Sequence, residues 1–259
     1  MFVSMIIPAY NEGKRIGRTL EAYGNFFEEK KKSGLDFEII VVANACKDNT
    51  SGVVRQIGKK YKEIKLLDFK QGGKGFAVKQ GFQEALNGKA DLIGFVDADL
   101  ATPPEAYFDL IKNINSYGGI IASRYVKGSV MKPRQKNFRI LVSRIGNFII
   151  RSLFMIPYRD TQCGAKLFKR EAVEKVIPKL NMTQWGIDID LLYNIRKLGY
   201  KIKEHPSIWQ DVGGSKLNVK KTSVQILLAA LQLRILTSKA RIFFKFFKPV
   251  AAYLYKHIK

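Results

Sequence analysis

The sequence predicts an α/β fold in which a mostly parallel sheet is flanked by helices. Short runs of apolar, β-branched residues alternate with longer stretches that have a helical spacing of apolar side chains. Polar or glycine-rich loops follow most of the apolar runs, as expected where a strand gives way to a helix. Strands that alternate with helices favour parallel pairing, and such sheets bind ligands outside the carboxyl ends of their strands.

The first half of the chain is expected to contain four strands, each a run rich in Val, Ile, Leu or Phe. The first helix should end at Ser33-Gly34, and Thr50 can cap the second helix. A glycine loop at residues 71–75 opens the third helix. The expected strands are residues 2–7, 37–42, 64–69 and 92–96, and the expected helices are residues 16–32, 50–60 and 74–86.

The second half is less regular. Pro103-Pro104 ends the fourth strand, because proline donates no backbone hydrogen bond. Beyond about residue 222, apolar clusters alternate with Lys and Arg, which predicts amphipathic helices at the C-terminal end. The other expected helices are residues 104–115, 137–156 and 185–198, and the expected strands are residues 120–125, the end of a turn-and-strand segment at 160–168, and 202–209.

The chain of 259 residues carries a formal net charge of +23, from 45 Lys and Arg against 22 Asp and Glu. This excess suits an anionic partner such as a phosphorylated ligand or an acidic membrane surface, although a general bias toward lysine also produces it. No RNA-binding or helix-turn-helix motif is evident, so nucleic acid is not the expected partner. The two cysteines, Cys46 and Cys163, predict neither a disulfide framework nor a zinc site and fit a reducing compartment.

The central motif is Asp97-Ala98-Asp99, which directly follows the expected strand at residues 92–96. Strand alternation would direct both carboxylates to the same side. Two carboxylates that close repel each other unless a cation lies between them or one is protonated. The pair therefore predicts a site for Mg²⁺ or Mn²⁺ that holds a diphosphate. The alternative is a solvated acidic pair in a turn.

A lysine lies in the glycine loop Gly73-Lys74-Gly75, between an expected strand and an expected helix. Backbone N–H groups at the start of a helix favour anions, so Lys74 and Gly75 are expected to lie near phosphates. The alternative is an exposed lysine in a turn.

Several motifs occur in an order typical of one enzyme family. The chain resembles family 2 glycosyltransferases with the GT-A, Rossmann-like fold in three motifs, which are residues 3–12 (VSMIIPAYNE), 73–75 and 97–99. It resembles the dolichyl-phosphate β-glucosyltransferase branch, a sibling of dolichyl-phosphate mannose synthase, in three more, which are residues 160–168 (DTQCGAKLF), 185–188 and 214–217.

The resemblance implies an inverting enzyme that moves a hexose from a nucleotide diphosphate sugar, UDP-glucose or GDP-mannose, to a polyprenyl or dolichyl phosphate. Asp97 and Asp99 would bind Mg²⁺ or Mn²⁺, and Asp99 and Asp188 would be catalytic. Asp188 would act as a general base or orient a sugar hydroxyl. The alternative interpretation is that Asp188 has no catalytic role and is an early-helix acidic residue, which the helix dipole favours. By position, the donor would be bound by Pro8, Ala9, Tyr10, Glu12, Asn44, Lys74, Gly75, Asp97, Ala98, Asp99 and Lys216, and the acceptor phosphate by Arg124, Arg139 and Ser143.

Two departures from the family pattern leave parts of this expectation open. Relatives usually carry Asp-Asp-Gly-Ser after the second strand, where this chain has residues 43–46, Ala-Asn-Ala-Cys. Asn44 offers a donor and an acceptor in place of a carboxylate, so the nucleotide base is not determined. Ala101 replaces a side-chain metal ligand of the mannose synthase branch, so Thr102, water or donor oxygens would complete the coordination.

The expected organisation is a glycosyltransferase domain at residues 1–217 and a basic amphipathic tail at residues 218–259 that associates with a membrane. We expect no signal peptide, because Pro8 and polar residues 11–14 end the first apolar stretch too early. We expect no membrane-spanning helix, because no stretch reaches about 18–20 apolar residues. Residues 138–156 and 224–255 are expected to lie on the anionic, cytoplasmic face of a membrane, with ordinary core helices as the alternative. The rival functions are transfer to a non-lipid or cell-envelope glycan, nucleotidyl transfer, and non-enzymatic binding of nucleic acid. The oligomeric state is left open.

Overall fold

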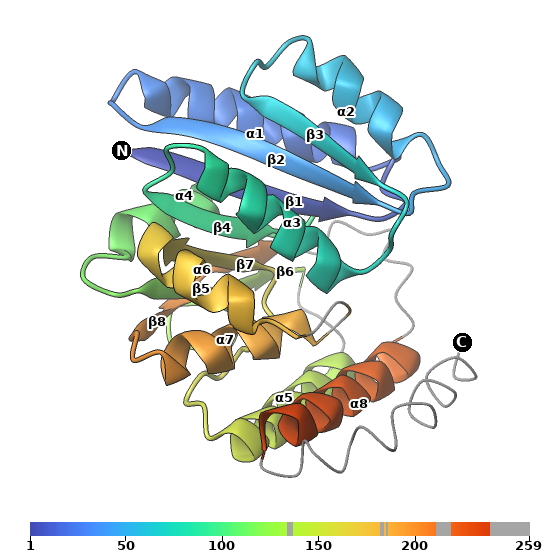
Figure 1. The fold of residues 1–259 in the computed structure, drawn as a ribbon, viewed down its shortest axis with the longest axis vertical. Helices are drawn as coiled ribbons and strands as arrows, with labels where there is room; N and C mark the ends of the chain where they lie inside the picture. The colour runs from blue at the N-terminus through green and yellow to red at the C-terminus, as the bar shows by residue number, and fades with distance from the viewer. Residues whose placement is uncertain (134–136, 182–183, 185, 211–218, 239–259) are drawn as a thin grey trace.

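The computed structural model of the chain describes residues 1–133, 137–181, 184, 186–210 and 219–238, without the side chains of 137–139 and 219–223. Its central strands are β1 (Phe2–Ala9), β2 (Asp36–Asn44), β3 (Ile64–Phe69), β4 (Leu92–Val96), β5 (Gly119–Ser123), β7 (Ala165–Lys169) and β8 (Ile202–Pro206). Among the described residues they form a seven-stranded sheet in the order β3-β2-β1-β4-β7-β5-β8 (Figure 1). β7 runs antiparallel to β4 and β5, and the other neighbours are parallel.

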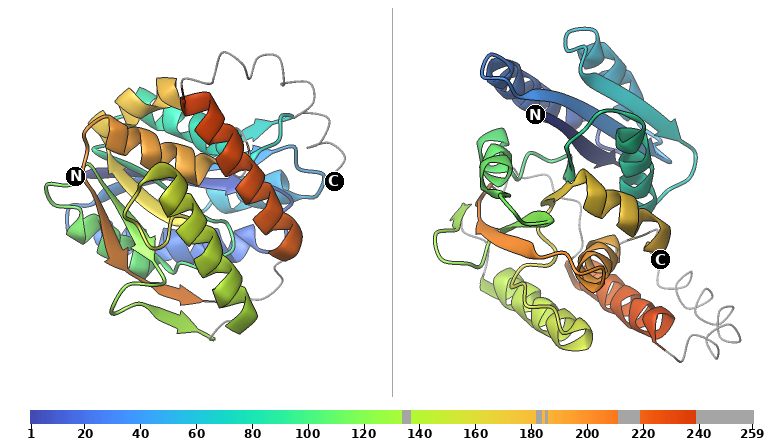
Figure 2. Two further views of the ribbon diagram at one scale, coloured as in Figure 1. Left: turned by 90° about the horizontal axis from the view of Figure 1, so that it is seen from below. Right: turned by 60° about the vertical axis from the view of Figure 1, so that its left-hand side comes forward.

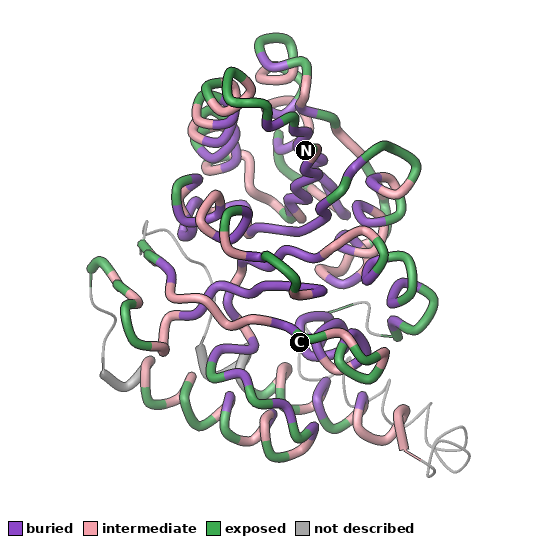
Figure 3. Tube along the Cα trace, turned by 90° about the vertical axis from the view of Figure 1, so that its left-hand side faces the viewer, coloured by how far each residue is buried: buried purple, intermediate pink, exposed green. Residues whose placement is uncertain are grey.

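Helices cover both faces of this sheet, and apolar side chains pack beneath them. The helices are α1 (Ile16–Lys31), α2 (Thr50–Gly58), α3 (Lys74–Asn87), α4 (Pro104–Asn113), α5 (Asn137–Phe154), α6 (Arg170–Val176), α7 (Ile187–Lys197) and α8 (Val219–Thr237), with a 3₁₀ turn at Ile177–Lys179. Met5 and Ile7 of β1 contact the layer that contains α1 and α4, whereas Ile6 contacts the layer of α3, α6 and α7. This alternation gives the sheet a core on each face, and the strands are buried through the middle of the molecule (Figure 3).

The predicted α/β class with a mostly parallel sheet is confirmed, but the expected strand at residues 202–209 is wrong. The strand is interrupted at Ser207, because β8 ends at Pro206 and β9 (Ile208–Gln210) begins directly after Ser207. β9 pairs with β6 (Val130–Lys132) in a separate two-stranded sheet. Ser207 makes the change of direction possible, because its N–H donates to Ser123 O and its carbonyl accepts from Val130 N. Of the expected segment at 160–168, only the part from Ala165 is strand.

α5 and α8 lie side by side at one end of the molecule (Figures 1 and 2). Ala230 and Leu233 of α8 belong to the same apolar core as Ile150 and Phe154 of α5. On their outer sides, both helices expose large apolar residues at helical spacing, and we refer to them as the α5/α8 apolar set: Leu141, Ile145, Phe148, Val224, Leu227 and Leu231. The expected domain boundary at 217–218 and residues 239–259 lie outside the described residues. None of the described helices is long and apolar enough to cross a bilayer.

Gly94 in β4 allows the close approach of β7. Gly94→Ala is expected to lower the free energy of unfolding by about 1–3 kcal/mol. The added methyl group would lie 2.3 Å from the carbonyl oxygen of Lys166 and 2.4 Å from Tyr107 Oη. Urea denaturation measures the effect, and Gly146→Ala in α5 is the control, because an added methyl there meets nothing within 4 Å. Equal stability of the two variants would contradict this prediction.

Candidate active site

The acidic motif lies in a turn directly after β4, at the carboxyl edge of the sheet. β4 ends at Val96, so the expectation that strand alternation positions the two carboxylates is wrong. The turn is held in place by backbone contacts: Asp97 N donates to Gly164 O at 3.0 Å, and Ala98 O accepts from Thr19 Oγ1 at 2.7 Å. A Cβ on Gly164 would lie 2.0 Å from Asp97 Oδ2, so only glycine allows this approach.

The electrostatics of the pair fit a divalent cation. Burial raises the pKa of Asp99, and the charge of Asp97 raises it further. Asp99 Oδ1 accepts a hydrogen bond from Ala101 N at 3.0 Å, and the Asp97 side chain is 40% exposed and therefore accessible to a ligand. A cation between the carboxylates would remove their repulsion. Mg²⁺ is commonly held by one or two carboxylates together with phosphate oxygens and water, so this donor set fits it or Mn²⁺.

Lys74 is the first residue of α3 and reaches the acidic motif. Its Nζ lies 2.9 Å from Asp97 Oδ1 and 3.5 Å from Asp188 Oδ2. Burial acts to lower the pKa of Lys74, but the charges of Asp188 and Asp97 outweigh it and raise the pKa. The side chain is 17% exposed, which excludes the alternative of an exposed lysine in a turn. Gly75, in the first turn of α3, is buried.

Asp188 lies in the first turn of α7 and is 3% exposed. Its Oδ1 lies 2.5 Å from the Nζ of Lys166, a fully buried lysine of β7. Burial acts to raise the pKa of Asp188, but the charges of Lys166 and Lys74 outweigh it and lower the pKa. A carboxylate with a lowered pKa is a permanent anion and a weak proton acceptor. Sequence reasoning missed Lys166, although a lysine inside an apolar strand is a signal that a charged partner is needed.

The loop after β1 supplies the expected donor residues. Pro8 and Ala9 end the strand, and Tyr10 follows with 56% of its surface exposed. Glu12 is held by Arg15, whose Nε and Nη2 donate to its carboxylate at 2.7 and 2.6 Å. Tyr10 thus presents an exposed ring at the start of this loop, and Glu12 forms part of the loop's framework.

Asn44 joins the β1 loop to the glycine loop. Its Nδ2 donates to Ala9 O at 2.8 Å, and its Oδ1 accepts from Gly73 N at 2.9 Å. The side chain is 3% exposed, so its polar atoms are used within the protein. A carboxylate at this position has no hydrogen to donate to Ala9 O.

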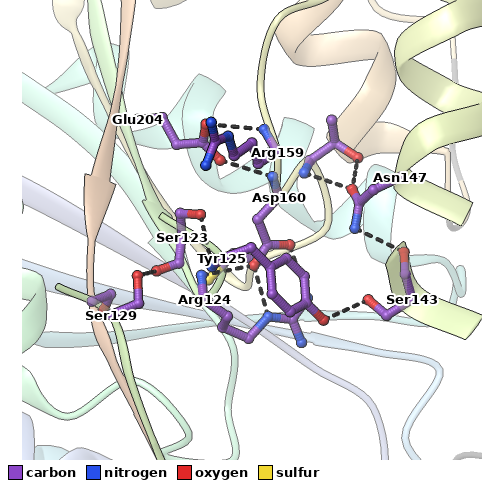
Figure 4. A network of polar contacts seen from close by, with 12 residues as sticks. Ser123, Arg124, Tyr125, Ser129, Ser143, Asn147, Arg159, Asp160 and Glu204 are labelled. Atoms are coloured by element: carbon purple, nitrogen blue, oxygen red, sulfur yellow. Dashed lines mark hydrogen bonds and ion pairs between the residues drawn. The ribbon is translucent and has the colours of Figure 1, made fainter. Parts of the chain in front are cut away.

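Arg124, which the sequence analysis expects to bind the acceptor phosphate, follows β5 and forms a two-pronged ion pair with buried Asp160 (Figure 4). Its Nε and Nη2 donate to the two carboxylate oxygens at 2.7 and 2.8 Å. Burial acts to lower the pKa of Arg124, but the charge of Asp160 raises it. Ser143 of α5 lies 2.9 Å from Tyr125 Oη. The side chain of Arg139, and Lys216 as a whole, lie outside the described residues.

The segment from Asp160 to Gly164 connects Arg124 to the acidic motif. One end binds Arg124, and the other end lies against Asp97. Hydrogen bonds from the backbone N–H groups of Arg159 and Asp160 to Glu204, at 2.9 and 2.8 Å, fix the first end.

The same segment is also bound to α5 (Figure 4). Asn147 Oδ1 accepts from Thr161 N at 2.9 Å and from its hydroxyl at 2.8 Å. Asn147 Nδ2 donates to Ser143 O at 3.0 Å. The structure therefore brings the two groups of expected site residues into one connected arrangement.

Comparison with known proteins identifies the family. The model of glycosyl transferase family 2 matches residues 4–177. A dolichyl-phosphate beta-glucosyltransferase of Dictyostelium discoideum is 33% identical over 245 residues, which cover 90% of this chain and 74% of the relative. The human protein of that name is 30% identical over 227 residues, with 83% and 69% covered.

A solved structure confirms the fold. Glucosyl-3-phosphoglycerate synthase from Mycobacterium tuberculosis, in complex with Mn²⁺, UDP and glucosyl-3-phosphoglycerate, matches with a TM-score of 0.65. It is 18% identical, and the match covers 89% of this chain and 79% of the synthase. The fold, the motif order and the family match agree, and the chain therefore belongs to glycosyl transferase family 2 and is a glycosyltransferase.

Proposed function

We propose that the chain is an inverting glycosyltransferase that moves glucose from UDP-glucose to a polyprenyl phosphate such as dolichyl phosphate. The observation that carries this proposal is the acidic pair Asp97 and Asp99, which lies beside Lys74 at the carboxyl edge of the sheet. The names of the relatives support glucose and a dolichyl phosphate acceptor. GDP-mannose is the second donor to test, because Asn44 leaves the base undetermined.

The acidic pair would hold Mg²⁺ or Mn²⁺ on the diphosphate of the donor. When bound, the cation supplies positive charge that stabilises the departing nucleoside diphosphate. Lys74, next to Asp97, adds a second positive charge on the same side, and Lys216 is proposed to add a third. Pro8, Ala9 and Tyr10 would frame the nucleotide.

The acceptor phosphate is already an anion at neutral pH. Its oxygen attacks the anomeric carbon, the bond from that carbon to the diphosphate breaks, and the configuration inverts to a β-linked product. This step needs no strong base, which agrees with the lowered pKa of Asp188. We therefore assign Asp188 to the orientation of Lys74 and a sugar hydroxyl. Arg124, Arg139 and Ser143 remain the proposed acceptor side, because they lie around α5 and the β5 loop.

The lipid acceptor requires contact with a bilayer, since moving a lipid chain out of the bilayer into water costs about 0.8 kcal/mol per CH₂ group. The α5/α8 apolar set presents Leu, Ile, Val and Phe side chains outward, and α5 carries exposed Arg144 beside them. We assign this surface to the interface of an anionic membrane. Cys46 and Cys163 are free thiols, which supports a reducing, cytoplasmic side. A non-lipid glycan acceptor is the competing proposal, and transfer to polyprenyl phosphate compared with transfer to free glycans discriminates between the two.

In a panel of UDP- and GDP-sugars with Mg²⁺ or Mn²⁺, glucose transfer from UDP-glucose to a short polyprenyl phosphate is expected. NMR should give a β-linked product, and an α-linked product would exclude a single displacement. Transfer only to free glycans would contradict the proposed acceptor.

Asp97→Asn is expected to lower kcat/KM by about 100-fold or more, because a ligand charge is lost. Asp109→Asn, which removes an exposed ion pair with Lys112 on α4, is the control.

Asn44→Asp is expected to raise the KM for the donor sugar by about tenfold, because a hydrogen bond is lost and a carboxylate then faces Ala9 O. Steady-state kinetics with varied donor measure this change. Asn113→Asp is the matched control, since Asn113 Nδ2 donates to Asp109 O at 2.9 Å, away from the site. An unchanged donor KM would show that Asn44 does not organise the two loops for binding.

The double variant Phe148→Glu/Leu227→Glu is expected to lose most sedimentation with anionic liposomes, because it adds negative charge to the α5/α8 apolar set. Gln56→Glu/Gln83→Glu carries the same added charge on exposed positions of α2 and α3 and serves as the control. Sedimentation of both variants at the wild-type level would remove this surface from the proposal.

A further inference from the structure

Lys166 is a fully buried lysine whose place in the site is explained by none of the donor or acceptor contacts above. It lies in β7, next to the acidic turn, and its Nζ donates to Cys163 O at 2.6 Å and to Asp188 Oδ1 at 2.5 Å. Burying an ammonium group is costly unless a charged partner and hydrogen bonds compensate it. Asp188 is that partner, and it lies on a different element of the fold.

Lys166 is the last of four charged side chains that form a continuous row of alternating sign. Asp97 contacts Lys74 at 2.9 Å, Lys74 contacts Asp188 at 3.5 Å, and Asp188 contacts Lys166 at 2.5 Å. Both ammonium groups also lie over the ring of Phe95, at 5.4 Å for Lys74 and 5.2 Å for Lys166. The row connects the turn after β4, the start of α3, the start of α7 and the start of β7.

We propose that Lys166 is a positioning residue for the donor site, which fixes the Asp188 carboxylate so that Asp188 holds Lys74 beside the diphosphate. This inference rests on the proposed function. Lys74 has a flexible stem, and its contact with Asp97 involves a carboxylate that the cation would also use. Asp188 is therefore the anchor of Lys74 that the cation does not share, and Asp188 in turn is held by Lys166.

A purely structural role for Lys166 makes a different prediction. In that case its loss would lower stability and leave the affinity of the folded enzyme for the donor unchanged. If Lys166 acts through Asp188, its loss weakens binding on the donor side and spares the acceptor side. The readout is therefore UDP affinity, with and without Mn²⁺, together with separate KM values for donor and acceptor.

The variants are Lys166→Met, Asp188→Asn and the double variant. Calorimetry should show that Lys166→Met raises the dissociation constant for UDP by about tenfold, whereas the KM for polyprenyl phosphate changes less than about twofold. Residues that act as one unit are non-additive, so the double variant should bind UDP no more weakly than Asp188→Asn alone. Lys203→Met, which removes a partly buried lysine of β8 that donates to Asn113 O, is the control.

Lys166→Met leaves the buried carboxylate of Asp188 with one partner fewer, and thermal unfolding shows whether the variant folds. If it does not, the comparison of the double variant with Asp188→Asn still decides, because the double variant removes both members of the pair. Unchanged UDP affinity in folded Lys166→Met, or an additive loss in the double variant, would overturn the inference. Failure of the wild-type chain to bind UDP would contradict the proposed function, which is a distinguishable result.

Discussion

The negative charge of Asp97 and Asp99 at the end of β4 is the constraint on which the arrangement of the site depends. Burial and, after it, repulsion from Asp97 raise the pKa of Asp99, so positive charge must be supplied nearby. Lys74 supplies it from the start of α3, and glycine at position 164 lets the neighbouring segment approach. The segment that ends at Gly164 carries Asp160, which binds Arg124 on the proposed acceptor side. The proposed donor and acceptor residues are thus positioned by one group of contacts.

The first half of the fold was predictable because each strand is a short run dominated by apolar residues and each helix has local start and stop signals. The expected strands at 64–69 and 92–96 match β3 and β4 at both ends. The second half was less predictable, because its pairing depends on distant segments. No local pattern indicates that β7 inserts antiparallel between β4 and β5. The break at Ser207 likewise depends on hydrogen bonds to Ser123 and Val130.

The residues of the site differ in the same way in how far the sequence predicts them. Asp97 and Lys74 were found from the sequence because each follows a strand of a parallel sheet, whose carboxyl ends share one edge. The roles of Asn44, Asp160 and Lys166 depend on partners 22 to 36 residues away, such as Asp188 for Lys166 and Arg124 for Asp160. Spacing within the sequence does not reveal such partners. A charged residue inside an apolar run indicates only that some partner exists.

The hydrogen bonds between Asn147 and Thr161 have a mechanical consequence. Asn147 lies on α5, and the outer side of that helix carries Leu141, Ile145 and Phe148. A tilt or rotation of α5 relative to the sheet would break these bonds and shift the segment that runs to Asp97. The orientation of this helix is therefore coupled through these hydrogen bonds to the position of the segment that lies between the proposed donor and acceptor residues.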